Sequence, residues 1–181
     1  LRRAGYATAA VVANFGVFGG AQPLLRGFER VEAEPLRPFY FKPWLFDLVW
    51  RFPQAPWLRG PAARYPSASM RAPSIVDRAL SQWSRPETRP RFLFVNLMEA
   101  HEPWIPEPED LGRFGPPGIA SEREQSATID RYLKRRGAAG NDVMILKARY
   151  EEALLGLDRS LARLLAGVTA EAGPAGTIVV V

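Results

Sequence analysis

Cysteine is absent from all 181 residues, which excludes disulfides and thiolate metal sites within this stretch. Histidine occurs once, as His101, so no pair of histidines with metal-ligand spacing exists. No run comes near the roughly 18 consecutive apolar residues that a membrane span requires. A Gly-rich phosphate loop, a nucleophile elbow and a recognisable nucleic-acid module are also lacking. With 47% hydrophobic and 24% charged residues, the composition is that of an ordinary globular domain.

The chain begins at Leu1 rather than at Met, so we expect the true amino terminus to lie upstream. The lack of a visible signal peptide is therefore uninformative. The net charge is +5, and the excess lies in residues 1–100, which carry 14 basic and 7 acidic side chains against 10 and 12 in the rest. A basic surface would attract nucleic acid, acidic lipid or sulfated glycans. A compositional preference for Arg, Ala, Gly and Pro explains the same excess, and we favour that simpler interpretation.

Three short apolar runs are typical of strands buried in a parallel sheet. They are residues 8–14 (TAAVVAN), 91–98 (RFLFVNLM) and 177–181 (TIVVV). The second run is the strongest prediction, because it is continuous, rich in aromatic and β-branched residues, and preceded by a proline.

Apolar residues at steps of three and four predict two amphipathic helices. Residues 74–84 have Ser74 as their N-cap and an apolar face formed by Ile75, Ala79, Leu80 and Trp83. Asn141 caps the longest helix, whose apolar stripe comprises Leu146, Tyr150, Leu154, Leu157, Leu161, Leu164 and Val168. Residues 121–136 are expected to be helical with a weaker pattern, and residues 1–5 to be the last turn of a helix that ends at Gly5.

Residues 15–34, which hold four glycines, and the Pro-rich residues 106–118 are expected to be loops. The order of elements is therefore strand, irregular segment, helix, strand, loop, helix and strand. That alternation predicts the α/β fold class, built around a largely parallel sheet.

The segment at residues 37–73 is dense in proline, arginine and aromatic residues, with Trp44, Trp50 and Trp57 spaced along it. Prolines on both sides confine any helix to about residues 45–52. Such a stretch suits a membrane surface, a lid or a partner groove. An irregular insertion packed on its own domain explains it as well, and we favour the insertion because the segment is poorly amphipathic.

His101 follows the strand 91–98 in a polar turn. Open α/β sheets bind ligands at the carboxyl ends of their strands. An imidazole there can donate to an anionic ester oxygen or pass a proton to a leaving group. Glu99 or Glu102 could orient the ring and fix its tautomer, and Trp104 could wall a pocket. Solvated or purely structural roles explain each of these four residues too.

Three blocks of sequence resemble the sulfatase family of the alkaline phosphatase superfamily. The first is LRRAGYATAAVVAN followed by RGFERVEAE; the second is RPRFLFVNLMEAHEPWIP, in which an apolar strand leads to a His followed closely by Pro and an aromatic residue; the third is RYEEALLGLDRSLARLLAGV with GTIVVV. They occur in the family's order and cover a little over half of the chain. The chain is therefore identified as an internal fragment of the N-terminal catalytic domain.

The resemblance implies a three-layer α/β/α sandwich like that of alkaline phosphatase, with residues 1–181 as a single partial domain and an insertion at about 37–73. It implies a sulfuric ester hydrolase, in which a formylglycine nucleophile attacks sulfur beside a calcium ion (Ca²⁺). The nucleophile and the metal ligands of that family would lie outside this chain, so the fragment alone is expected to be inactive. Only His101 matches a family active-site position, as the catalytic and substrate-binding residue that contacts the sulfate or the leaving oxygen.

Two alternatives stay open. Phosphodiesterases, phosphonate hydrolases and phosphoethanolamine or phosphoglycerol transferases belong to the same superfamily, and the blocks that distinguish them lie outside this chain. A non-catalytic protein of the same fold could instead bind an anionic polymer through residues 37–73. The expected partner is an anionic sulfate ester; no nucleic acid is expected, and membrane-surface contact through residues 37–73 is not favoured.

Overall fold

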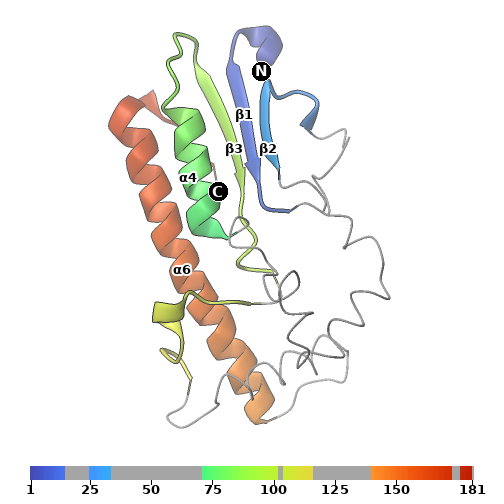
Figure 1. The fold of residues 1–181 in the computed structure, drawn as a ribbon, viewed down its shortest axis with the longest axis vertical. Helices are drawn as coiled ribbons and strands as arrows, with labels where there is room; N and C mark the ends of the chain where they lie inside the picture. The colour runs from blue at the N-terminus through green and yellow to red at the C-terminus, as the bar shows by residue number, and fades with distance from the viewer. Residues whose placement is uncertain (15–24, 34–70, 102–103, 116–139, 173–175, 181) are drawn as a thin grey trace, which may run out of the picture. The chain divides into compact units, whose positions relative to one another are not determined.

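The computed structural model describes residues 1–14, 25–33, 71–101, 104–115, 140–172 and 176–180. The elements are η1 (Arg2–Ala4), β1 (Ala7–Val12), β2 (Arg30–Ala33), α4 (Ala72–Trp83), β3 (Arg91–Asn96), η5 (Pro108–Asp110) and α6 (Asn141–Ala172) (Figure 1). They belong to two compact units. We call Leu1–Met98 with Leu164–Val181 the sheet unit, and Glu99–Arg163 the helix unit. The segment predicted as an insertion, apart from residues 71–73, and the helix predicted at 121–136 lie outside the described residues.

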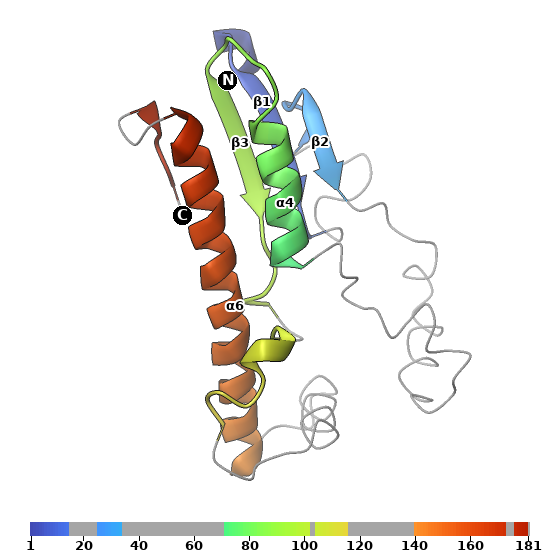
Figure 2. The same cartoon turned by 60° about the vertical axis from the view of Figure 1, so that its left-hand side comes forward.

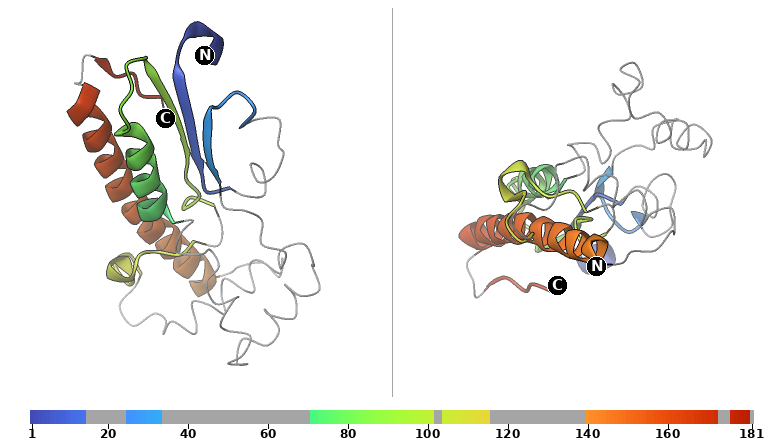
Figure 3. Two further views of the ribbon diagram at one scale, coloured as in Figure 1. Left: turned by 45° about the horizontal axis from the view of Figure 1, so that its top comes forward. Right: turned by 90° about the horizontal axis from the view of Figure 1, so that it is seen from below.

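The sheet unit contains a three-stranded parallel sheet, with the strands in the order β2-β1-β3 (Figures 1 and 3). Ala7 pairs with Arg91 at the start of β3, and Ala9 pairs with Arg30 at the start of β2. The predicted α/β class with a parallel sheet is therefore confirmed. The strands predicted at 8–14 and 91–98 are confirmed as β1 and β3, each within two residues of the expected ends.

β1 is the centre of the core, and all six of its residues are buried. Strands flank it on both sides, and its two faces carry different apolar clusters. Val11 and Ala13 pack with the buried residues of α4 and of the end of α6, namely Ile75, Val76, Ala79, Leu164 and Val168. Figure 2 shows α4 lying along this face of the sheet. Ala10 and Val12 pack on the other face with Leu25, Phe28, Ala33 and Phe94.

The helix predicted at 74–84 is confirmed as α4, but its N-cap is Arg71 rather than Ser74. A proline occupies the first turn. Because N–H groups in the first turn have no partner within the helix, proline is tolerated there, and the helix can begin before Ser74. The predicted apolar face is confirmed at Ile75 and Ala79, which are fully buried. Residues 1–5 also end as expected, since Gly5 adopts the left-handed conformation (φ 85°) after the short helix η1.

β2 is a strand where the sequence predicted a loop. Its sequence, Arg-Val-Glu-Ala, is half-buried or exposed and has no continuous apolar run, so local pattern does not mark it as a strand. Pairing with β1 makes it one, and Thr8 of β1 helps to anchor the chain just before it. The N–H of Glu29 donates to Thr8 Oγ1 over 3.0 Å, and that hydroxyl donates to the carbonyl of Gly27 over 3.3 Å.

The strand predicted at residues 177–181 is wrong for the described residues 177–180, which lie outside any strand. Ile178 is 93% exposed and Val180 is 91% exposed. An apolar run becomes a buried strand only when its backbone joins a hydrogen-bonded ladder. No ladder among the described residues includes this segment.

α6 confirms the long helix, with two corrections. Asn141 is its first residue rather than its cap, and the predicted stripe is buried at Leu146, Leu164 and Val168 but not between them. Tyr150 is exposed, and the next three leucines of that stripe are only half-buried, whereas Glu152, Ala153, Gly156 and Ser160 are buried. Gly156 lies on this buried side and allows a close approach, because a Cβ atom there would lie 3.2 Å from Glu107 Cγ. Among the described residues, no helix has the length and apolarity needed to cross a lipid bilayer.

Candidate functional site

The carboxyl ends of β1 and β3 are held together by a side chain. Asn96, the last residue of β3, accepts a hydrogen bond from the backbone N–H of Asn14 at its Oδ1 (2.9 Å) and one from the N–H of Ala13 at its carbonyl (3.0 Å). The sequence patterns above did not single out either asparagine. A polar residue that ends an apolar strand at the ligand-binding edge of a parallel sheet was the available signal.

His101 lies in the helix unit, in a bend a few residues beyond the end of β3, and its side chain is exposed. It is the one histidine of the whole chain. An exposed imidazole can reach a solute, and near neutral pH it can act as a hydrogen-bond donor or as a proton donor. The catalytic and substrate-binding role of His101 stays a prediction.

The two glutamates expected to orient His101 differ in what the structure describes. Glu99 is half-buried in the turn that precedes the histidine, and Glu102 lies outside the described residues. Orientation of the imidazole by either carboxylate stays a prediction.

Trp104 packs on α6 and binds back to its own loop. Its indole Nε1–H donates to the carbonyl of Ala100 over 3.2 Å. Its ring meets that of Tyr150 edge-on, with centroids 5.8 Å apart and an interplanar angle of 76°, an arrangement that aromatic quadrupoles favour. Trp104 thus fastens the histidine loop to the helix, a contact that the sequence could not specify.

Asp110 is the most buried of the acidic residues that the structure describes in the helix unit, with a side chain that is 0% exposed. Both of its oxygens accept hydrogen bonds from the guanidinium of Arg159, one of them over 2.8 Å. Arg113 Nε lies 3.6 Å from Asp110 Oδ1. The hydrogen bonds from Arg159 hold the pKa of the Asp110 carboxyl below its usual value, against the opposing effect of burial. The same pairing raises the pKa of Arg159.

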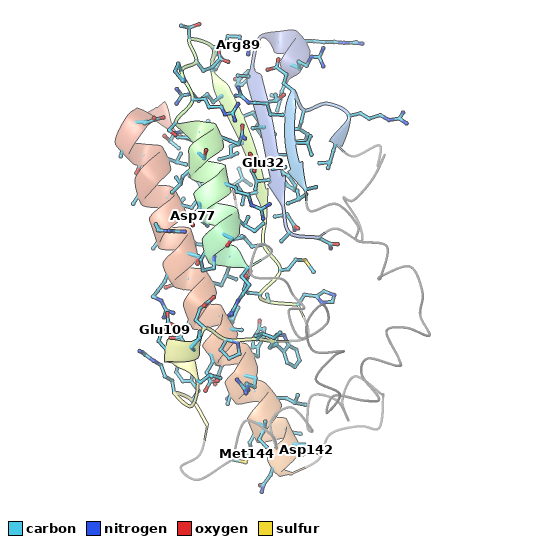
Figure 4. All side chains as sticks on the ribbon, in the orientation of Figure 1. Glu32, Asp77, Arg89, Glu109, Asp142 and Met144 are labelled. Atoms are coloured by element: carbon cyan, nitrogen blue, oxygen red, sulfur yellow. The ribbon has the colours of Figure 1, made fainter. Side chains whose placement is uncertain are left out.

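Glu109, labelled in Figure 4 on η5 beside α6, adds a second carboxylate to Arg159 at 3.3 Å. The ion pair between Asp110 and Arg159 joins residues that are 49 positions apart. Asp110 and Arg159 anchor the segment that follows His101 to α6, and neither residue was predicted. An acidic residue in a Pro-rich loop gives no signal of its own, because its partner is distant in sequence.

No three His, Cys, Asp or Glu side chains lie close enough to hold a metal ion in the part of the chain that the structure describes. A role for His101 has to be derived from its imidazole and from the loop that carries it.

No protein-family model, no curated protein and no solved structure matches this chain. The described residues define an α/β protein with a parallel sheet. Assignment of a reaction is accordingly a proposal, supported by the histidine loop and by the three sequence blocks.

Proposed function

We propose that this chain belongs to a sulfuric ester hydrolase of the sulfatase type, in which His101 contacts the anionic ester. The observation that supports the proposal is an exposed histidine in the loop that leaves the carboxyl end of β3. Parallel α/β sheets bind ligands at those loops. The resemblance of three sequence blocks to sulfatases supports the same chemistry.

The imidazole would act on the oxygen of the scissile S–O bond. As that bond breaks, the alcohol oxygen takes over the bonding electron pair and develops negative charge. A protonated His101 donates a hydrogen bond to this oxygen or transfers its proton to it, so that the alcohol leaves. Sulfur would meanwhile gain a bond to the nucleophile that the resemblance implies outside this chain, and the overall reaction consumes one water and gives an alcohol and sulfate. In the complete enzyme, the resemblance implies that a calcium ion bound by residues outside this chain would neutralise charge on the sulfate group.

The complete domain would be a three-layer α/β/α sandwich. One face of the sheet carries α4, while the other face presents a second apolar cluster around Ala10, Val12 and Phe94. An apolar face of this kind is stable only when another layer covers it.

His101→Ala in the complete gene product should lower turnover of an aryl sulfate by about 10²- to 10⁴-fold, because general acid catalysis contributes on that order. His101→Gln keeps a hydrogen-bond donor but cannot deliver a proton, so it separates the two roles. Met144→Ala is the control, since Met144 is 47% exposed in the first turn of α6 (Figure 4). Steady-state kinetics and circular dichroism would be measured for all four proteins.

Unchanged turnover in His101→Ala would remove this assignment. The same assays should include aryl phosphate monoesters and diesters. Preference for a phosphate ester, lost in His101→Ala, would support the phosphoryl-transfer relatives instead of a sulfatase.

A further inference from the structure

The side chain of Trp104 connects the loop that carries His101 to α6. Its Nε1–H lies 3.2 Å from the carbonyl oxygen of Ala100, the residue directly before the histidine. Its ring is half-buried and meets the ring of Tyr150 on α6 edge-on at 5.8 Å. All four residues belong to the helix unit.

The bond to Ala100 constrains His101 because a peptide group is planar. The carbonyl of Ala100 and the nitrogen of His101 belong to the same rigid plane. A donor that holds this oxygen fixes the plane from which the Cα and the side chain of His101 project. One hydrogen bond thus limits where the Cα of His101 lies, and with it the region that the imidazole can reach, without contacting the ring.

The position of Trp104 is itself set by two contacts with α6. Tyr150 fixes the ring of the indole, and the Asp110–Arg159 ion pair fixes the segment that follows it. Gly156 lets this segment approach the helix, because any Cβ there would meet Glu107 Cγ at 3.2 Å. The indole ring of Trp104 and the segment that follows it are therefore both held against α6.

We propose that Trp104 is a positioning residue for His101, and that it transmits the rigidity of α6 through Tyr150 to the Ala100 carbonyl. A tryptophan that merely filled the edge of the core would need only its ring. The indole N–H, which is directed at the peptide of the histidine, is the feature that packing does not explain. The consequence for an anionic ester rests on the proposed function, whereas the ordering of the imidazole does not.

The experiment compares Trp104→Phe with the wild-type chain by proton NMR. His101 is the only histidine, so its Cε1–H signal is unique and reports on this loop alone. Phenylalanine keeps an aromatic ring against Tyr150 but lacks the N–H donor. Spectra would be recorded without anions and during a titration with inorganic sulfate, and circular dichroism would verify the fold.

In Trp104→Phe we expect a changed chemical shift and line width for His101 without anions, and an apparent sulfate affinity weaker by roughly 2- to 10-fold, as for the loss of one hydrogen bond. Tyr150→Leu keeps the indole N–H of Trp104 but removes the aromatic ring against which the indole packs. It should therefore change the His101 signal and the sulfate affinity in the same direction by a smaller amount. Phe114→Leu is the control, because Phe114 is an exposed aromatic of the same unit (49% exposed); it should leave the signal unchanged.

A folded Trp104→Phe protein with the wild-type His101 signal and sulfate response would overturn the positioning role. If Trp104→Phe does not fold, a folded Tyr150→Leu protein with the wild-type His101 signal and sulfate response would overturn the positioning role instead. If the wild-type signal does not respond to sulfate, the spectra without anions decide whether Trp104 orders the histidine, and the proposed function is judged separately by the turnover of His101→Ala in the complete gene product.

Discussion

β1 in the sheet unit buries six consecutive residues of which five are apolar, whereas the helix unit buries Asp110, Arg149 and Glu152. In the sheet unit, aliphatic side chains from α4 and from the end of α6 cover the strands. In the helix unit, a buried carboxylate and a guanidinium hold a loop to α6. Among the described residues, the sheet unit is stabilised mainly by removing apolar surface from water, whereas the helix unit adds buried paired charges to buried apolar residues such as Ile145 and Leu146.

The difference has consequences for the histidine loop. Apolar burial is nearly independent of direction, so it stabilises a core without specifying one orientation of a loop. A bidentate ion pair and an N–H donor have strict geometry. The helix unit, which carries the candidate site residue, therefore owes the position of its loop to the more directional contacts.

The largest effect is expected in the sheet unit. Ile75 is fully buried between α4 and the sheet, and Ile75→Ala should lower the free energy of unfolding by about 2–5 kcal/mol through lost transfer energy and the cavity left behind. Val143→Ala, at a 52% exposed position of α6, should change it by less than about 0.5 kcal/mol. Urea denaturation followed by circular dichroism measures both. Similar changes in the free energy of unfolding for the two variants would contradict the placement of Ile75 in the core.

An intermediate effect is expected from the ion pair of the helix unit. Asp110→Asn keeps the shape of the side chain but removes the charge that Arg159 binds, and it should lower Tm by about 2–10 °C. Glu109→Gln is the matched control, because Glu109 contacts the same arginine from the same short helix but is 62% exposed. Calorimetry that gives equal losses for both variants would show that burial of Asp110 does not matter.

The Asp110 pair also predicts a pH dependence. Its pKa is lowered in the folded protein, so folding favours the ionised carboxylate. Its contribution to stability is fully present above the unfolded pKa of about 3.9 and is lost as the pH falls through the folded pKa. The Tm values of wild type and Asp110→Asn should therefore converge in acid. A constant difference from neutral pH to below the folded pKa would rule out this linkage.

The smallest effect is expected at the amino end of the sheet, where Figure 4 labels Arg89. Its guanidinium bonds Glu29 at 3.0 Å and Glu87 at 2.7 Å, and hydrogen bonds from it lower the pKa of Glu87 to about 2. Arg89 is 42% exposed, so water and salt screen the pairs. Arg89→Gln should lower Tm by less than about 3 °C, and by less still in 1 M salt. A loss that equals that of Asp110→Asn would abolish the distinction between exposed and buried pairs.

Local pattern was sufficient to predict β1, β3, α4 and α6. The first two are apolar runs that are nearly continuous, and the helices repeat apolar residues at the helical period, so neighbouring residues carry the signal. β2 could not be predicted in this way, because its half-exposed sequence becomes a strand only beside β1. Residues 177–180 show the reverse case, an apolar β-branched run outside any strand.

The amino-acid sequence by itself determined which segments are apolar at the helix or strand period, and it identified the single histidine that follows a strand. Tertiary structure decided which face of α6 is buried, that Asn96 connects two strand ends, and that Trp104 and the Asp110–Arg159 pair hold the loop of His101. The physical reason is distance along the chain. Periodicity is a property of adjacent residues, whereas a hydrogen bond or an ion pair between residues 49 positions apart exists only once folding has brought them together.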